Sequence, residues 1–297
     1  MLWYSFRVSR SIDTDFLPGV AISTTGEEHR MGFLETSVVG WSAALPAGSP
    51  VFVTVDGTAD TAARVAEVLA GTSAQVNRIG QPHDKDRVRD GRVGVAANKN
   101  TGLELLMAAG VLDLFLSDDD TTPRNPDALK LHQNLSSPHS MVCWGKSRMD
   151  TTHKGETAAW TWPRGVMLYQ HRVIVDSVGG MVEDFGPGGH EHAEWSMRIH
   201  NGGWTPANFP SPLEYWRKGG MGAEDYWLPQ DMRRRGESLP AHQKRKQALT
   251  TVRRRKGDWT KIGALMESLE GSTQFFPYQA CENGREPSTL FTTSQGA

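Results

Sequence analysis

Residues 112–120, Leu-Asp-Leu-Phe-Leu-Ser-Asp-Asp-Asp, join an apolar stretch directly to three aspartates. The apolar part has the length and composition of a buried strand. Asp118, Asp119 and Asp120 follow at its carboxyl end, and carboxylates are not buried without partners. The segment therefore predicts a strand that ends at a ligand-binding edge, although aspartates also occur in ordinary turns and helix caps.

Strand-like and helix-like stretches alternate upstream of this segment. Strands are predicted over 19–25, 51–57 and 76–79, and helices over 31–45, 61–70 and 100–109. The alternation predicts an α/β fold with a Rossmann-like, mostly parallel sheet and flanking helices. Because ligands bind such sheets beyond the carboxyl ends of the strands, we expect Ser23, Thr24 and Asp56 to meet the aspartates there.

The second half of the chain is less regular. A strand and a short helix are predicted over 166–178, a polar helix within 186–203 and a basic helical segment over 233–256. Five tryptophans accompany them: Trp144, Trp160, Trp162, Trp195 and Trp204. Each one alone is expected in the core, while the group as a whole suggests a partly aromatic cleft.

The composition is that of a soluble globular protein. Of the 297 residues 38% are hydrophobic and 22% are charged, and the net charge is −2, which gives no general reason to expect binding to nucleic acid or membrane. The sequence has no apolar run of the roughly 18 residues that a membrane span needs and no signal-peptide pattern. Two cysteines exclude a disulfide framework and favour a cytoplasmic location.

The aspartate cluster has the chemistry of a metal site. If the strand continued, the side chains of Asp118 and Asp120 would point to the same side. Mg²⁺ and Mn²⁺ take oxygen ligands and commonly bridge one or two carboxylates to substrate phosphates. We therefore expect Asp118 and Asp120 to hold a divalent cation.

Common catalytic motifs are absent from the sequence. It has no Gly-x-x-x-x-Gly-Lys-Ser/Thr loop, no Gly-x-Gly-x-x-Gly after the first strand and no Gly-x-Ser-x-Gly, so kinase, classical dehydrogenase and α/β-hydrolase functions lose their main support. Residues 55–58 are similar to the nucleophile loop of haloacid dehalogenase phosphatases. Thr54 stands where that loop needs its nucleophilic aspartate, which excludes the phosphatase.

Residues 188–198, Gly-Gly-His-Glu-His-Ala-Glu-Trp-Ser-Met-Arg, form a further polar segment. On a helix, Glu194 and Arg198 would make a structural i,i+4 ion pair. Glu191 and His192 would stand at the helix start, after two glycines that allow a ligand to approach closely. The spacing does not match the His-Glu-x-x-His pattern of zinc proteases.

Together these segments resemble the GT-A class of nucleotide-sugar glycosyltransferases, in the style of its family 2 and of the polypeptide N-acetylgalactosaminyltransferases. The likeness covers about residues 18–204. The Asp-x-Asp metal motif of the class is matched by residues 118–120, and the Asn that opens the preceding helix is matched by Asn100. The Val-Asp-Asp-Gly-Ser of the second strand is matched by residues 55–58 with one residue fewer. The late Gly-Gly-x-Glu-Asp block is matched by residues 188–198, with His192 in place of the Asp.

The resemblance implies a role for each residue. The donor would be a nucleotide diphosphate sugar, with a UDP-sugar expected, and it would contact Ser23, Thr24, Asp56, Asn100, Asp118 and Asp119. Asp118 and Asp120 would hold Mn²⁺ or Mg²⁺ on the diphosphate, with His242 as a further candidate ligand. In an inverting mechanism Glu191 or His192 would remove the acceptor proton; a retaining mechanism, which needs no such base, stays open.

The resemblance also implies an organisation and a setting. A nucleotide-sugar-binding half would occupy residues 18–125, an acceptor-side half 126–230 and a basic C-terminal extension 231–297. The acceptor would be a protein, a glycan or DNA. A phage-encoded enzyme that modifies virion proteins or DNA in the host cytoplasm is one such setting, without stable insertion into a membrane.

Two other functions stay open. A nucleotidyltransferase of related fold would consume a nucleoside triphosphate; such enzymes usually carry a basic, Gly-rich loop after the first strand, where residues 23–28 are acidic. A non-catalytic protein that binds glycan or nucleic acid through the Trp-rich and basic half would not depend on Asp120.

Overall fold

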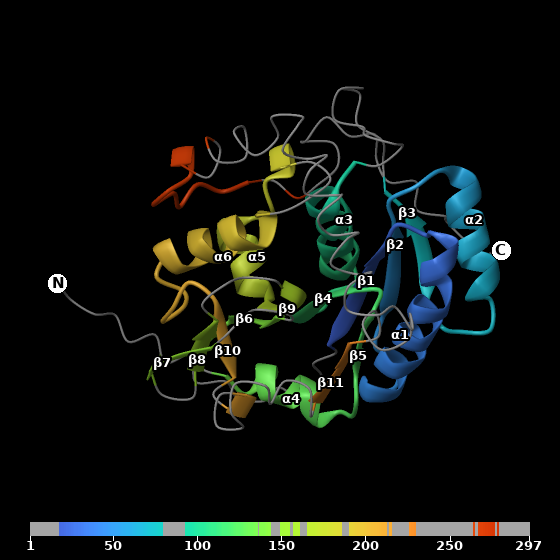
Figure 1. Cartoon of the computed structure of the whole chain (residues 1–297), viewed down its shortest axis with the longest axis horizontal. Coiled ribbons are helices and arrows are strands. Elements are labelled where there is room, and N and C mark those ends of the chain that lie inside the picture. The colour runs from blue at the N-terminus through green and yellow to red at the C-terminus, as the bar shows by residue number, and fades with distance from the viewer. Residues whose placement is uncertain are drawn as a thin grey trace, which may run out of the picture.

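Six strands form the central sheet, in the order β3-β2-β1-β4-β9-β6. The computed structural model describes residues 18–79, 93–135, 137–143, 149–154, 157–160, 165–185, 190–212, 214–215, 226–229, 264, 267–276 and 278. The sheet strands are β1 (Gly19–Thr24), β2 (Val51–Val55), β3 (Gln75–Arg78), β4 (Asp113–Asp118), β6 (His139–Cys143) and β9 (Gly165–His171). The first four run parallel and β9 runs antiparallel to its two neighbours. The expected α/β fold with a mostly parallel sheet is confirmed (Figure 1).

The centre of the sheet is apolar because β1 has a partner on each side. Val20 pairs with Val51 of β2 and with Phe115 of β4, and Val20, Ala21 and Ile22 are completely buried. Central strands of parallel sheets are covered on both faces, which is why they consist of continuous apolar runs. The strands predicted over 19–25 and 51–57 are confirmed, each with slightly later predicted ends than those observed.

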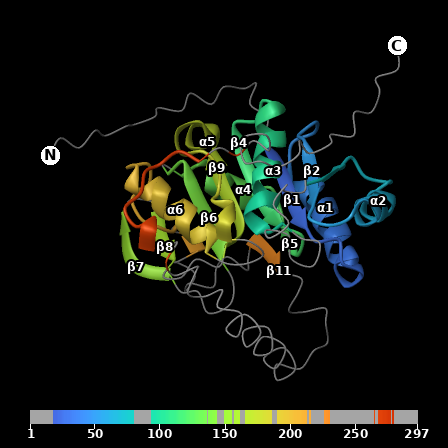
Figure 2. The same ribbon diagram turned by 90° about the horizontal axis from the view of Figure 1, so that it is seen from above.

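Helices cover both faces of this sheet. α1 (Met31–Ala44) and α2 (Ala59–Val68) lie on one face, and α3 (Val95–Ala108), α5 (Arg172–Val178) and α6 (Glu191–Asn201) lie on the other (Figure 1). From above, α5 and α6 are seen on the side of β9 and β6, while α1 and α2 lie on the side of β1 and β2 (Figure 2). The remaining short helices are η1 (Glu28–Arg30), α4 (Asp127–Gln133) and η3 (Glu183–Phe185).

The start of α3 differs from the prediction, which placed the helix over 100–109. The helix begins at Val95, because Gly94 takes a φ of 132° as its N-cap residue and a carboxylate from another strand binds the preceding backbone. Asp56, after β2, accepts hydrogen bonds from the backbone N–H of Val93 at 2.8 Å and of Gly94 at 2.9 Å. A cap that comes from a distant strand leaves no local sequence signal.

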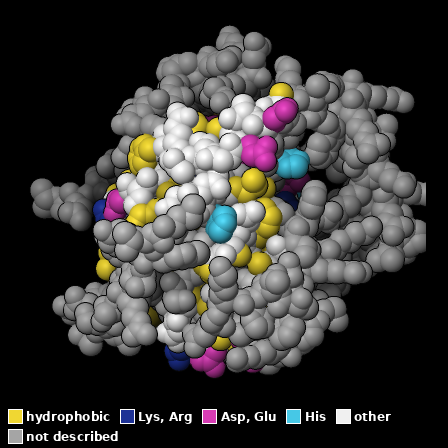
Figure 3. Space-filling view, turned by 90° about the vertical axis from the view of Figure 1, so that its left-hand side faces the viewer, with side chains coloured by type: hydrophobic (Ala, Val, Ile, Leu, Met, Phe, Trp, Pro, Cys, Tyr) yellow, Lys and Arg dark blue, Asp and Glu magenta, His cyan; other side chains and the backbone are white. Residues whose placement is uncertain are grey.

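Two small sheets accompany the large one. One contains β7 (Met149–Lys154), β8 (Thr157–Trp160) and β10 (Pro210–Pro212), and the other pairs β5 (Thr121–Pro123) with β11 (Trp227–Pro229). The face of the molecule on this side shows hydrophobic, acidic and histidine side chains interspersed among its described residues (Figure 3). The basic segment 233–256, His242, Trp144 and Trp162 lie outside the described residues.

Two of the tryptophans on this side belong to the core. Trp160 is 4% exposed and donates its indole N–H to the carbonyl of Met141 at 3.0 Å. Trp195 is fully buried and donates to the carbonyl of Gly179 at 3.0 Å. The core interpretation is therefore confirmed for both. Among the residues that the structure describes, no helix is both long and apolar enough to cross a membrane.

A buried hydrogen-bond chain ties β11 to the core. The hydroxyl of Tyr215 accepts the indole N–H of Trp227 at 2.7 Å and lies 2.9 Å from Nε2 of His132. Nδ1 of His132 lies 2.7 Å from the Ser140 hydroxyl, so both ring nitrogens have a hydrogen-bond partner. Burial, with a smaller contribution from His139, lowers the pKa of His132 to about 3.

A second buried histidine stands beside this chain. His139 lies 3.0 Å from the carbonyl of Tyr169 through Nδ1 and 2.8 Å from the Ser196 hydroxyl through Nε2. Burial lowers its pKa to about 4, against the raising effect of the Tyr169 carbonyl. Both histidines are therefore neutral in the folded protein at pH 7.

Acidification is expected to destabilise the protein through these two histidines. Their folded-state pKa values lie below the unfolded value of 6.5, so the unfolded chain binds protons first and the stabilisation is complete only above pH 6.5. The free energy of unfolding falls as the pH drops toward about 4, by up to about 1.4 kcal/mol per pH unit for each histidine. Urea unfolding at pH 7, 6 and 5 measures this slope.

The control for this slope is His29→Asn, since the side chain of His29 is 51% exposed. This variant should show the same slope as the wild type. A free energy of unfolding that stays constant between pH 7 and pH 5 would contradict the neutral, buried state of His132 and His139.

Candidate active site

The strand ends bring the predicted residues to one edge of the sheet. In the register of the central strands, Ser23 lies opposite Asp118 of β4, and Thr24 lies opposite Val55, the residue before Asp56. Residues almost a hundred positions apart therefore meet beyond β1, β2 and β4. This is the edge at which parallel α/β sheets bind ligands.

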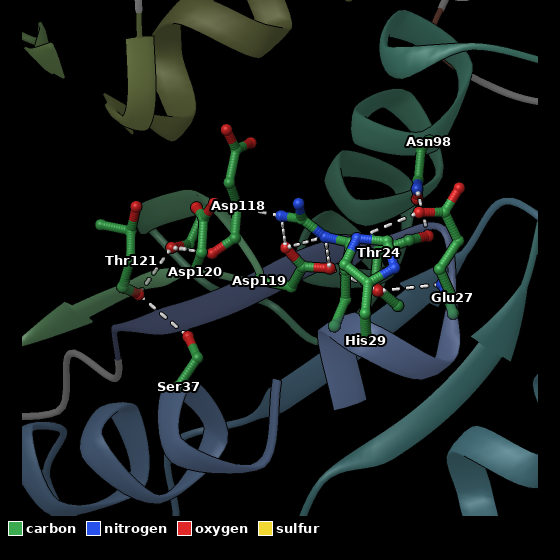
Figure 4. Close-up of polar contacts among 12 residues, drawn as sticks. Thr24, Glu27, His29, Ser37, Asn98, Asp118, Asp119, Asp120 and Thr121 are labelled. Carbon is green, nitrogen blue, oxygen red and sulfur yellow. Dashed lines mark hydrogen bonds and ion pairs between the residues drawn. The ribbon is translucent and has the colours of Figure 1, made fainter. Parts of the chain in front are cut away.

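The three aspartates point in different directions. β4 ends at Asp118, and Asp119 and Asp120 form a turn before β5, so the condition for placing Asp118 and Asp120 on the same side of a strand is not met. Asp119 turns inward with 1% of its side chain exposed, whereas Asp118 keeps 33% and Asp120 keeps 17% exposed. Only the two outer carboxylates are available to a ligand (Figure 4).

Three hydrogen bonds to one carbonyl oxygen fix the end of this turn. The oxygen of Thr121 accepts hydrogen bonds from the Ser37 hydroxyl at 2.9 Å, from the Trp41 indole at 3.2 Å and from the Ser117 hydroxyl at 3.3 Å (Figure 4). Two of these donors lie on α1. The helix therefore fixes the backbone that presents Asp118 and Asp120.

The central carboxylate has its own cation. Asp119 accepts a hydrogen bond from the Thr24 hydroxyl at 2.6 Å and from Nε of Arg30 at 2.8 and 2.9 Å, with a further ion pair to Nη2 (Figure 4). Nη2 of Arg30 also lies 3.1 Å from Asp120. Burial alone would lower the pKa of Arg30, but Asp119, with Asp120 and Asp118, raises it above its ordinary value.

Arg30 was not identified from the sequence, and its position bears on the nucleotidyltransferase alternative. The loop at 23–28 is acidic, but Arg30 in η1 follows it directly and supplies a cation at the carboxyl end of β1. The acidic composition of the loop is therefore no longer an argument against a nucleotidyltransferase.

The second cation, Lys99, was also missed. Its side chain is completely buried on α3, and Nζ lies 2.8 Å from Oδ1 of Asp118. The signal was present in the sequence, since Asn98, Lys99 and Asn100 are three consecutive polar residues inside a helix that faces the sheet, and all three are buried. A helix of this kind must direct polar atoms to partners or to a ligand.

Asn98 presents one unpartnered atom at the same edge. Its amide N–H donates to the carbonyl of Thr24 at 3.1 Å, which fixes the orientation of the side chain (Figure 4). Its Oδ1 is buried without a hydrogen-bond partner among the residues that the structure describes, as are the hydroxyls of Ser23 and Thr25. Buried polar atoms without partners are rare in native proteins and indicate a missing ligand or water.

Two predicted donor contacts have structural partners instead. Asn100 donates to the Met181 carbonyl at 2.9 Å and to Glu183 at 2.8 Å, and accepts from Met181 N–H at 2.8 Å, which ties α3 to η3. Asp56 holds the N-terminus of α3, as described above. Their contact with a donor stays a prediction.

The N-terminus of α6 brings the other predicted residues to the site. Glu191 and His192 are 5% and 8% exposed, and Oε1 of Glu191 lies 3.6 Å from Nε2 of His192. Burial lowers the pKa of His192, opposed by Glu191 and influenced by Lys99 and Asp118. The imidazole therefore stands within electrostatic reach of the Lys99–Asp118 pair.

The predicted ion pair of this helix is confirmed. Nε of Arg198 lies 2.5 Å from Glu194, both side chains are buried, and Arg198 also donates to the carbonyls of Val178 and Gly180 at 2.6 and 2.7 Å. These contacts anchor α6 to the core.

The acidic residues fit a metal ion only as part of a larger complex. Within the described ranges, no three His, Cys, Asp or Glu side chains are grouped so that they could hold an ion by themselves. Asp118 and Asp120 offer hard oxygen ligands, and Mg²⁺ commonly uses one or two carboxylates together with substrate phosphates. The donor set therefore suits Mn²⁺ or Mg²⁺ that is shared with a diphosphate.

Comparison with known proteins gives a likeness in fold. No protein-family model matches the chain, and no curated protein matches it in sequence. A mannosyltransferase from Pyrobaculum calidifontis, solved with GDP-mannose and Mn²⁺, is 15% identical with a TM-score of 0.42 and covers 86% of each chain. A Drosophila β-1,4-galactosyltransferase 7 mutant, solved with manganese, UDP-galactose and xylobiose, is 16% identical with a TM-score of 0.38 and covers 68% of this chain and 74% of that one.

A third similar structure has another activity. The inositol-1-phosphate CTP transferase of T. maritima is 12% identical with a TM-score of 0.33, and the match covers 54% of this chain and 73% of that one. At these identities and TM-scores, the likeness says nothing about the activity of this chain.

Removing Arg30 is expected to destabilise the protein strongly. Arg30→Met leaves the carboxylate of Asp119 buried and without its cation, which should lower the free energy of unfolding by about 3 kcal/mol. Replacing both partners, as Arg30→Met with Asp119→Asn, should recover much of this loss, because no uncompensated charge remains. Urea unfolding of the three proteins measures the effect.

Arg172→Met is the matched control, since Arg172 pairs with Asp176 on the surface at 3.6 Å. Its loss should stay below about 1 kcal/mol. If Arg30→Met is no more destabilising than this control, Asp119 does not depend on Arg30.

Proposed function

We propose that the chain is a metal-dependent glycosyltransferase that moves a sugar from a nucleotide diphosphate sugar to an acceptor. The observation that carries this proposal is the convergence of two kinds of group at one sheet edge. The partly exposed carboxylates of Asp118 and Asp120 suit a cation on a diphosphate. His192, next to Glu191, is close enough to Asp118 and Lys99 for their charges to act on its pKa, and both residues suit proton transfer. Transfer of a sugar to a hydroxyl needs both functions in one place.

The nucleoside would bind next to β1. Within the described part of the chain, Oδ1 of Asn98 and the hydroxyls of Ser23 and Thr25 are buried there without hydrogen-bond partners. The hydroxyls can donate or accept and the fixed Oδ1 can only accept, which matches a ligand rich in hydroxyl and N–H groups. A UDP-sugar is the proposed donor, and its ribose and base carry such groups.

The diphosphate would lie over the aspartate turn. The metal ion, when bound by Asp118 and Asp120, neutralises the charge that develops on the departing nucleoside diphosphate. Lys99 and Arg30 hold the three aspartates in place and add positive charge to the same edge. The proposed acceptor is a protein, a glycan or DNA.

A nucleotidyltransferase is the second candidate. Arg30 at the end of β1 is the observation that favours it, because a cation in this place suits the phosphates of a nucleoside triphosphate. The two activities differ in their products: the transferase releases a nucleoside diphosphate and free or transferred sugar, and the nucleotidyltransferase releases pyrophosphate.

The test is nucleotide release from a panel of donors. The full chain is incubated with Mn²⁺ and UDP-glucose, UDP-galactose, UDP-N-acetylglucosamine or GDP-mannose, with water as the acceptor. One donor should be turned over, EDTA should abolish the reaction, and Asp120→Asn should slow it by at least about 100-fold through loss of charge stabilisation.

The control is Asp127→Asn, because Asp127 lies on α4 with 69% of its side chain exposed, and it should retain full turnover. Pyrophosphate release from a nucleoside triphosphate would favour the second candidate. Absence of both turnover and Mn²⁺-dependent nucleotide binding would leave a non-catalytic binding protein as the better explanation.

A further inference from the structure

We infer that Lys99 lowers the affinity of the site for a divalent cation alone and raises its affinity for the diphosphate, so that cation binding waits for the nucleotide. This inference rests on the proposed function and deepens it, because it states how the cation is loaded. It follows from the charges at the aspartate turn, from the burial of Lys99 and from what a diphosphate adds.

Both carboxylates that suit the cation are already paired with a positive charge of the protein. Nζ of Lys99 lies 2.8 Å from Oδ1 of Asp118, and Nη2 of Arg30 lies 3.1 Å from Oδ2 of Asp120. The remaining carboxylate, Asp119, is paired with the same arginine. Three carboxylates and two protein cations leave this group with one net negative charge, which attracts a free divalent ion only weakly.

Lys99 cannot withdraw from its pair into the solvent. Its side chain is completely buried, and its neighbours fix the turn of α3 that carries it. Asn98 donates to the last carbonyl of β1 at 3.1 Å, and Asn100 donates to the carbonyl of Met181 at 2.9 Å. A buried charge is screened little by its surroundings. A cation that shared the carboxylate of Asp118 would therefore be repelled by the neighbouring ammonium group.

Arg30 opposes a cation less firmly than Lys99 does. Its Nε lies 2.8 and 2.9 Å from the two carboxylate oxygens of Asp119, and Nη2 pairs with the same carboxylate. The contact with Asp120 is a single one at 3.1 Å. Arg30 can give up Asp120 and still neutralise its buried partner, whereas Lys99 has no such second carboxylate in the turn to move to. Lys99 is therefore the residue on which the exclusion of a free cation depends.

A diphosphate reverses this balance. It brings oxygen ligands, which Mg²⁺ commonly combines with one or two protein carboxylates, and it brings negative charge that Lys99 and Arg30 attract. Within the described ranges, no three His, Cys, Asp or Glu side chains are grouped so that they could hold an ion by themselves, so the nucleotide would supply the ligands that the protein lacks. Cation and nucleotide then raise each other's affinity by the same factor.

An independent observation points to a ligand at this edge of the sheet. Oδ1 of Asn98, next to Lys99 in the chain, is buried without a hydrogen-bond partner in the described part of the molecule, and the side chain is 4% exposed. The hydroxyl of Ser23, opposite Asp118 in the sheet register, is in the same state. Such atoms indicate a missing ligand or water.

The first test uses the wild-type protein and needs no turnover. Binding of Mn²⁺ alone is followed through the electron paramagnetic resonance signal of the free ion, and binding of UDP is measured by calorimetry in EDTA and in Mn²⁺. UDP should bind at least about 10-fold more tightly in Mn²⁺ than in EDTA, within the usual range of coupling between two ligands. Equal affinity of Mn²⁺ for the protein with and without UDP would overturn the inference.

The second test removes the opposing charge. Lys99→Met keeps most of the buried volume, and Asp118, with 33% of its side chain exposed, can be hydrated when it loses its partner. Mn²⁺ alone should bind this variant about 10-fold more tightly than it binds the wild type, because the repulsion is gone. UDP in EDTA should bind about 10-fold more weakly, because a positive charge near the diphosphate is lost. A merely structural role of Lys99 would weaken the binding of both.

Lys130→Met is the matched control, since Lys130 makes the same kind of pair with Asp127 on the surface at 3.3 Å. Both affinities should stay within about twofold of the wild type in this variant. Circular dichroism shows whether Lys99→Met is folded; if it is not, the wild-type measurement still decides. Unchanged or weaker binding of Mn²⁺ alone to folded Lys99→Met would overturn the inference.

The two affinities also separate this inference from the proposed function. If no donor is turned over but Lys99→Met changes them in opposite directions, the proposed function has failed and the role of Lys99 has not. If Mn²⁺ binds neither protein, with or without UDP, both have failed.

Discussion

The carboxylate of Asp119 is buried between two strands, and much of the site depends on how its charge is neutralised. Arg30 reaches it from the short helix after β1, and Thr24 reaches it from the end of β1 itself. The same arginine extends to Asp120. The buried Asp119 thus sets the positions of the partly exposed Asp118 and Asp120. A rotation of the turn that moved either of them would expose the Asp119 carboxylate or separate it from Arg30.

α3 has a comparable double role. Its face toward the sheet is apolar along most of its length, yet its first turns place Asn98, Lys99 and Asn100 in buried positions. Lys99 pairs with Asp118, Asn98 holds the end of β1, and Asn100 holds the segment before α6. One helix therefore links the three elements that make up the site, and Asp56 in turn fixes its start. Polar atoms in such a network fix a single arrangement, since each has one set of partners.

The sequence was most informative where local chemistry decided the structure. The run into Asp118 and the Val-rich strand after Pro50 marked two neighbours of β1, and the alternation of strands and helices gave the parallel sheet. It was least informative where the partner is distant. Nothing near Val95 shows that Asp56 caps α3, and nothing near Arg30 shows that its partner lies 89 residues later. The period-2 argument for Asp118 and Asp120 required the strand to continue, whereas β4 ends at Asp118 and Asp119 turns inward to pair with Arg30. The polar run at the start of α3 was visible in the sequence, but only the structure shows that Lys99 pairs with Asp118 of the sheet.

The hydrogen bond between Thr24 and Asp119 joins residues 95 positions apart, and this has a consequence for how the chain folds. β1 is completed only when β2 and β4 lie on its two sides, and closing a loop of that length is slow compared with forming a helix or hairpin. Without that closure, Arg30 lacks its ion pair with Asp119 and the turn at Asp119 and Asp120 lacks the contacts that stabilise it. The contacts that form the candidate site are therefore the same long-range contacts that complete the centre of the core, and neither can form without the other.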